Sequence, residues 1–79
     1  MNFELFKAFH ASYSRAQRSN QHYYVIPHRD KVFISTSAYS INDNTLFYIV
    51  KSSGSITKYN NGLIFNVGPL DNLKAGDYV

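Results

Sequence analysis

The chain of 79 residues contains no cysteine and no tryptophan, and only 16% of its residues are charged. Without cysteine it can form neither a disulfide framework nor a thiolate metal site, and it has no cysteine nucleophile. Its apolar runs fall well short of the ~18–20 residues needed to span a bilayer, so no membrane association is expected. The N-terminal stretch carries acidic Glu4 and lacks a long apolar core, unlike a signal peptide. These absences favour a cytoplasmic protein.

Charge is distributed unevenly along the chain, whose net charge is +3. Residues 32–79 carry three basic and three acidic side chains, so all of the excess lies in residues 1–31. An acidic partner would therefore meet the N-terminal third. The five basic residues of that third are Lys7, Arg15, Arg18, Arg29 and Lys31.

Periodicity predicts a helix over residues 3–18. At 100° per residue its large apolar side chains fall within an arc of about 100°, which is typical of a helix lying on a core. Glu4 near the start and Arg18 near the end suit the helix dipole. The predicted stripe consists of Leu5, Phe6, Phe9, Tyr13 and Ala16.

The remainder of the chain reads as β-structure. Pro27 and Asp30 are turn formers, and Asn61-Gly62 between apolar runs is the strongest short signal for a β-hairpin. The C-terminal tail, residues 69–79, is expected either to add a short edge strand or to lie loose. The predicted strands are residues 22–26, 31–37, 45–51, 55–60 and 63–67.

These elements predict a single α+β domain over residues 1–79, with one N-terminal helix packed on an antiparallel β-meander of four to five strands. The strands place large side chains on both faces: in 45–51, Tyr48 opposes Phe47. One helix can cover only one face, and an uncovered apolar face usually marks an interface. We therefore expect a homodimer through the sheet or a docked partner, the alternative being a strongly curled sheet that encloses its own core.

No constellation of residues predicts catalysis, a cofactor or a metal. The candidate metal ligands His10, His22, His28 and Asp30 match no ligand framework, and His22 and His28 lie at opposite ends of a strand. No nucleophile elbow or phosphate loop is present. A metal-free ribonuclease toxin using the histidines, Arg29 and Tyr23 is the most credible enzyme, but a chain this short builds only a shallow pocket. We expect a protein that is not an enzyme.

Nucleic-acid binding is the alternative function. The five basic residues of the N-terminal third supply phosphate contacts, while Tyr23, Tyr24 and Phe33 offer rings for base stacking. However, there is no run of basic residues and no recognised nucleic-acid-binding motif.

Protein docking is the favoured function, because Tyr, Phe and Arg are enriched in the cores of interfaces. The predicted contact residues are Tyr23, His28, Arg29, Lys31 and Phe47. In general kind, and with no aligned motif, the chain resembles the small cysteine-free proteins that phages and other mobile elements carry. That resemblance implies an inhibitor that sits on a host machine, such as an anti-CRISPR or another anti-defence protein.

Overall fold

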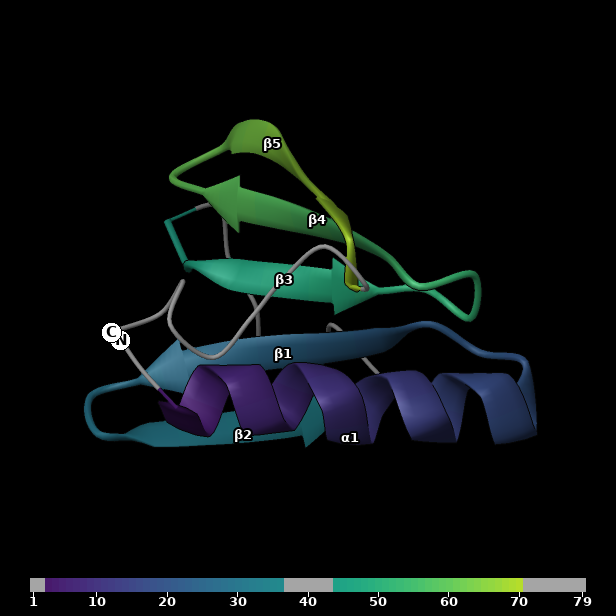
Figure 1. Cartoon of the computed structure of the whole chain (residues 1–79). Coiled ribbons are helices and arrows are strands. Elements are labelled where there is room, and N and C mark those ends of the chain that lie inside the picture. The colour runs from purple at the N-terminus through teal and green to yellow at the C-terminus, as the bar shows by residue number, and fades with distance from the viewer. Residues whose placement is uncertain (1–2, 37–43, 71–79) are drawn as a thin grey trace.

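The computed structural model describes residues 3–36 and 44–70. One helix, α1 (Phe3–Ser19), precedes a single five-stranded antiparallel sheet. In Figure 1 the helix lies in front of the sheet, along β1 and β2. The α+β prediction, with the helix packed on an antiparallel sheet, is confirmed. The strands are β1 (Tyr23–His28), β2 (Lys31–Ser35), β3 (Phe47–Val50), β4 (Ser55–Asn60) and β5 (Leu63–Pro69).

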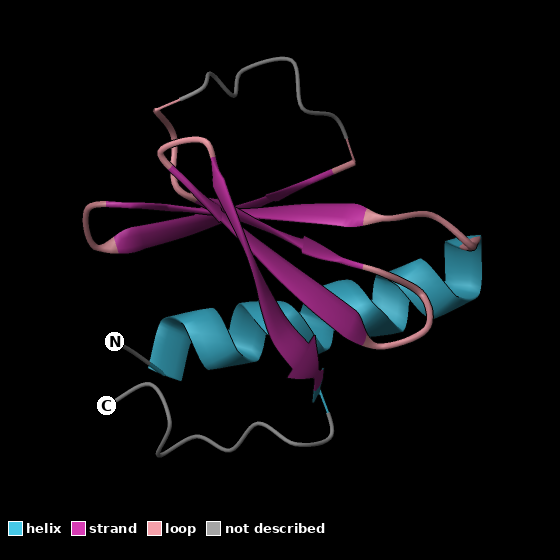
Figure 2. Ribbon diagram, turned by 90° about the horizontal axis from the view of Figure 1, so that it is seen from above, coloured by secondary structure: helices cyan, strands magenta, loops and turns pink. Residues whose placement is uncertain are grey.

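The strand order is β2-β1-β3-β4-β5, so the first hairpin turns outward to one edge and β3 pairs with β1. Tyr24 lies opposite Ile49 and Val25 opposite Tyr48 in that pairing. The sheet is strongly twisted, so that strands from its two edges cross each other when the molecule is viewed from above (Figure 2). Because of the strand order, β2 and β5 form the two edges of the sheet.

β4 has the predicted bounds, whereas the other strands differ from the predictions by one or two residues at one or both ends. The difference at the first hairpin also changes the turn. β1 continues through Pro27 to His28, and His28 pairs with Lys31, so the turn contains only Arg29 and Asp30. Pro27 fits within the strand because its ring fixes φ near the extended region, whereas the predicted turn began there. The predicted Asn61-Gly62 turn is present, with positive φ at both residues. The predicted tail lies outside the described residues except for Pro69 and Leu70.

The core forms where α1 meets the sheet. Phe9 is fully buried, and its ring meets that of Tyr48 edge-on at 4.9 Å between centroids. Phe6 and Tyr13 of the predicted stripe are only half-buried, because the buried helix face is centred slightly to one side and takes in two small residues. These are Ala8 and Ser12, which let the helix approach the sheet closely.

The far end of the chain closes this core. Leu70 is 2% exposed and belongs to the same apolar cluster as Phe9. Its backbone N–H donates to the carbonyl of Gly54 at 2.8 Å, which ties it to the β3–β4 turn. Gly54 itself has φ of +92° and lies against the Tyr13 ring, so the turn requires glycine there. Within the described residues, no helix has the length and apolar character needed to cross a membrane.

Ser12→Ala is expected to stabilise the fold. Its hydroxyl is fully buried and has no hydrogen-bond partner among the described residues. An unsatisfied buried hydroxyl costs about 1–3 kcal/mol, and alanine is also the better helix former. We expect urea or thermal unfolding to show a gain of about 1–2 kcal/mol in the free energy of unfolding.

The matched control is Ser14→Ala, since Ser14 is exposed on the same helix. This change tests helix propensity alone and should contribute about 0.5 kcal/mol or less. Equal effects of the two substitutions would show that burial of the Ser12 hydroxyl carries no penalty.

Candidate docking surface

One face of the sheet points away from α1, and we call it the open face. Val25, Tyr48 and Val50 are buried on the helix side, so their neighbours along each strand project to the opposite side. The strand pairings place the same kind of side chain side by side across the sheet. The open face consists of Tyr24, Ile26, Phe33, Phe47, Ile49, Tyr59 and Ile64.

Three aromatic rings form a row across the middle of the open face. Phe47 and Tyr59 are cross-strand partners whose rings stack in parallel, with centroids 4.7 Å apart and an interplanar angle of 1°. Tyr24 continues the row from β1, with its ring centroid 6.0 Å from that of Phe47. Each ring limits the rotamers of the next, so the row presents a fixed surface.

The open face ends in a positively charged hairpin. His28 and Lys31 follow Ile26 and precede Phe33 on this face, and both are exposed. Phe33, which is 51% exposed, therefore lies between the aromatic row and Lys31. An acidic partner surface would meet a ring and a positive charge within one strand length.

The hairpin turn contains an unusual backbone conformation at Arg29. Its φ is +60°, whereas the other non-glycine residues with positive φ in the described part of the chain are Asn20 and Asn61. Asparagine tolerates this region, but a side chain such as that of arginine adopts it at a cost of roughly 1–2 kcal/mol. Strain of this kind is concentrated at functional sites, which makes the turn a candidate contact point.

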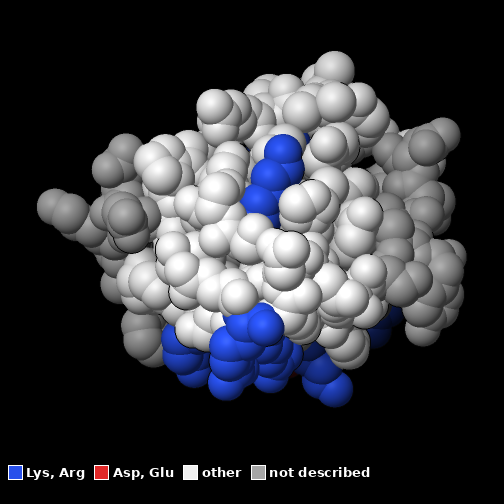
Figure 3. Space-filling model, turned by 90° about the vertical axis from the view of Figure 1, so that its right-hand side faces the viewer, with Lys and Arg blue, Asp and Glu red and all other residues white. Residues whose placement is uncertain are grey.

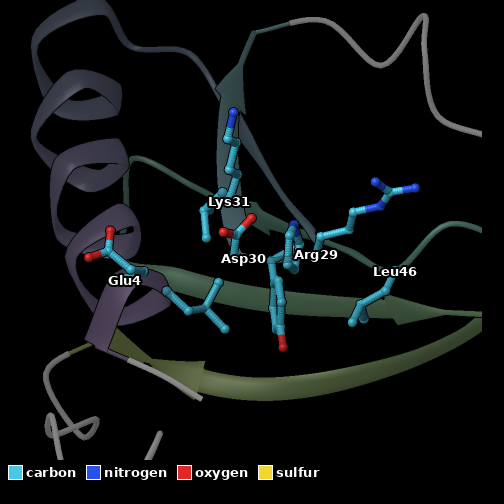
Figure 4. Close-up of a pocket in the computed structure, with 9 residues that line it drawn as sticks. Glu4, Arg29, Asp30, Lys31 and Leu46 are labelled. Atoms are coloured by element: carbon cyan, nitrogen blue, oxygen red, sulfur yellow. The ribbon is translucent and has the colours of Figure 1, made fainter.

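A hollow of about 220 Å³ lies on the helix side of the same hairpin. Figure 4 shows Glu4 approaching it from α1, while Arg29 and Lys31 extend in different directions from the turn. Ligand pockets usually enclose about 300–1,000 Å³, so this hollow suits one side chain of a partner better than a cofactor. Its apolar wall includes Leu5, Pro27, Val32, Leu46 and Tyr48.

Tyr48 lines this hollow, and the fold alters the ionisation of its hydroxyl. Burial raises the pKa of Tyr48 above its ordinary value of 10.0. Its hydroxyl therefore remains protonated at neutral pH. A neutral phenol of this kind can donate a hydrogen bond to a partner but does not act as a base.

The structure divides the five predicted contact residues between the two faces. His28, Lys31 and Phe47 lie on the open face, and Arg29 occupies the turn at its end. Tyr23 pairs with buried Val50 and so projects to the helix side. A partner on the open face would thus meet the first three directly, and Arg29 at its border.

The five basic residues predicted for nucleic-acid contact fall into two groups. Arg15 and Arg18 are exposed in the last turns of α1, where Figure 3 shows cations gathered over the helix and no acidic side chain on the face in view. Arg29 and Lys31 lie beside the start of the helix, about 20 Å away along its axis. Lys7 forms an ion pair with Glu4 at 3.0 Å.

The three histidines are spread over separate elements. His10 is exposed on α1, where its ring contacts that of Phe6 at 4.6 Å, while His22 and His28 flank β1. In the part of the chain that the structure describes, no group of three or more His, Cys, Asp or Glu residues could hold a metal ion. Near His22 a shallower hollow of about 430 Å³ is lined by Asn20, Gln21, Tyr24 and Thr36.

Strand β5 is a surface that the sequence analysis missed. Leu63, Ile64 and Phe65 are 63%, 65% and 46% exposed, although they form a continuous apolar run. The sequence carries a signal for this surface, because the run does not alternate between apolar and polar residues. Such a run fits an edge strand that the helix does not reach, whose two faces are both exposed to solvent.

Comparison with known proteins identifies no relative. No protein-family model matches the chain, and neither a curated protein nor a solved structure is significantly similar to it.

Arg29→Gly is expected to raise the free energy of unfolding by about 1 kcal/mol, because glycine adopts positive φ without strain. Arg29→Ala is the control, since it removes the guanidinium but keeps the β-carbon, and its effect should stay within about 0.5 kcal/mol. Chemical denaturation measures both. Equal stability of the two variants would contradict the assignment of strain to this turn.

Tyr48→Phe is expected to change the dependence of stability on pH. Because the pKa of Tyr48 is raised in the folded state, the stability linked to its proton is fully present below the unfolded pKa and is lost as pH rises through the folded pKa. As pH rises above about 10, the wild type should lose more stability than the variant. Thermal unfolding across this range measures the difference, and parallel curves would contradict the prediction.

Proposed function

We propose that the chain is a small non-enzymatic binding protein that docks on a larger protein or nucleoprotein complex in the cytoplasm and blocks or modulates it. The observation that carries this proposal is the aromatic row Tyr24–Phe47–Tyr59 on a sheet face that α1 does not cover. The three rings are half-buried, and exposed Phe33 and Ile64 lie on the same face. Contiguous apolar surface of this kind often marks an interface.

The chemistry of the open face supports protein docking. Rings that are already ordered lose little conformational entropy on binding, and Tyr, Phe and Arg dominate the energetically important positions of interfaces. His28 and Lys31 border these rings and would favour an acidic partner. The small hollow beside the hairpin offers a place for one partner side chain.

The type of target is proposed from the resemblance to phage and mobile-element proteins. Many of those proteins inhibit host defence by occupying the working surface of a larger machine, and they need no chemistry of their own. We propose the same task here, as an anti-defence inhibitor such as an anti-CRISPR. A cation-bordered apolar face suits a machine that offers either an acidic surface or its bound nucleic acid as the contact.

Direct nucleic-acid binding is the second candidate, and the cation cluster at the end of α1 is the observation that favours it. Arg15 and Arg18 would contact phosphates there, with His22 and Tyr24 nearby along the chain. The separation of these cations from Arg29 and Lys31 argues against one continuous track for a duplex. Binding through either group should weaken steeply with salt.

The two candidates are separated by substitutions on different surfaces. Phe33→Ser with Lys31→Glu alters exposed positions of the open face, and Arg15→Glu with Arg18→Glu alters the helix end. Affinity purification from the native host, followed by mass spectrometry, should recover a stoichiometric partner with the wild type. We expect the open-face variant to lose this partner and the helix-end variant to retain it.

The opposite pattern identifies the second candidate. Loss of DNA or RNA binding at ~50 mM salt in the helix-end variant, with no protein partner recovered by the wild type, would contradict docking. Circular dichroism of both variants verifies that the fold is intact.

A further inference from the structure

We propose that two copies of this chain pair through their β5 strands, edge to edge and antiparallel, about a two-fold axis at Phe65. The pairing would join the two five-stranded sheets into a single ten-stranded sheet. It does not rest on the docking function, because of the residues of the open face only Ile64 lies on this strand edge.

β5 has the properties of an unprotected edge. It is the terminal strand of the sheet, it carries no charged residue, and its side chains are exposed on both faces. Natural proteins usually protect such edges with charge, proline or a covering element, because unpaired N–H and C=O groups recruit another strand. Of these devices β5 carries proline, at its last residue, Pro69, which leaves residues 63–66 unprotected by it. α1 lies over β1, β2 and β3, so it does not obstruct an approach to β5.

The turn fixes which backbone groups of β5 are available. Asn60 and Leu63 flank the two-residue turn and form its closing hydrogen-bonded pair, so Leu63 and Phe65 direct their N–H and C=O groups toward β4. Ile64 and Asn66 alternate with them and direct theirs outward. Beyond this point the Gly68 N–H donates to the Asn66 side-chain oxygen at 3.0 Å, and the bulge near Ile56 ends the regular ladder.

These outward groups select one register. A two-fold axis through Phe65 places Ile64 opposite Asn66 of the second copy, and Asn66 opposite its Ile64. Both residues then exchange their outward N–H and C=O groups with the partner strand. With the axis at Ile64 or at Asn66, only the residue on the axis pairs in this way, and the other lies opposite Gly62 of the turn or opposite Gly68, whose N–H already donates to Asn66. Phe65 faces its own copy in a non-hydrogen-bonded pair, the geometry that brings side chains closest.

Charge distribution favours a second copy as the occupant of this edge. The basic residues of α1 and the first hairpin lie in the other half of the sheet, so pairing at β5 keeps them far apart. The nearest cation is Lys58, whose amine lies 5.9 Å from the Phe65 ring centroid. In the paired sheet the two Lys58 backbones would lie three strand spacings apart, about 14 Å.

Cysteine cross-linking tests the register, since the chain has no cysteine of its own. Phe65→Cys places two thiols in a non-hydrogen-bonded pair with Cα atoms about 4.5 Å apart, within the range of a disulfide. We expect mild oxidation to give a covalent dimer on a non-reducing gel. Leu63→Cys is the matched control on the same face of the strand, and its two thiols would lie about 13 Å apart and stay unlinked.

Sizing by light scattering over a dilution series tests the dimer itself. The wild type should show twice the mass of one chain, and Ile64→Lys should show a single chain with unchanged circular dichroism. Phe33→Lys, an equally exposed position on the other edge strand, should remain dimeric. A wild type that is monomeric at every concentration, a dimer that survives Ile64→Lys, or equal cross-linking at positions 63 and 65 would overturn the proposal.

Discussion

The packing of α1 on β1, β2 and β3 is the constraint on which the rest of the molecule depends. Phe9 sits at its centre, against Tyr48, and removal of such a ring from a core commonly costs about 3–5 kcal/mol. One helix of 17 residues is all that the described part of the chain supplies to cover five strands. The helix therefore shields one face of the sheet near β1 and does not itself cover the opposite face or β5.

This arrangement accounts for two separate surfaces with different chemistry. The open face combines ordered rings with a positively charged border, which suits recognition of another molecule's side chains. The β5 edge offers backbone groups and uncharged side chains, which suit recognition of another strand. Because the two surfaces share only Ile64, occupation of one leaves most of the other free.

Much of the fold could be predicted from the sequence, because its signals are local. The helix, the strand positions and the Asn61-Gly62 turn follow from periodicity and turn chemistry. The strand order could not be predicted, since local signals do not show which strand pairs with the edge of β1 that faces away from β2. The burial of Ser12 was also missed. A polar side chain is expected to face solvent, but the close packing of α1 on the sheet buries this one. The sequence did not predict that Tyr23 and Phe47 lie on opposite faces of the sheet. Their relative placement depends on the cross-strand register, which only the three-dimensional structure supplies.

The buried position of Leu70 has a consequence for how the protein forms. The helix and the first hairpin are local and can appear within microseconds, but the apolar cluster gains its last members from β4 and from Leu70. Synthesis proceeds from the N-terminus, so a nascent chain exposes the incomplete core until residue 70 has left the ribosome. The apolar cluster is then completed only after residue 70 has emerged, so the aromatic strands stay exposed until that moment.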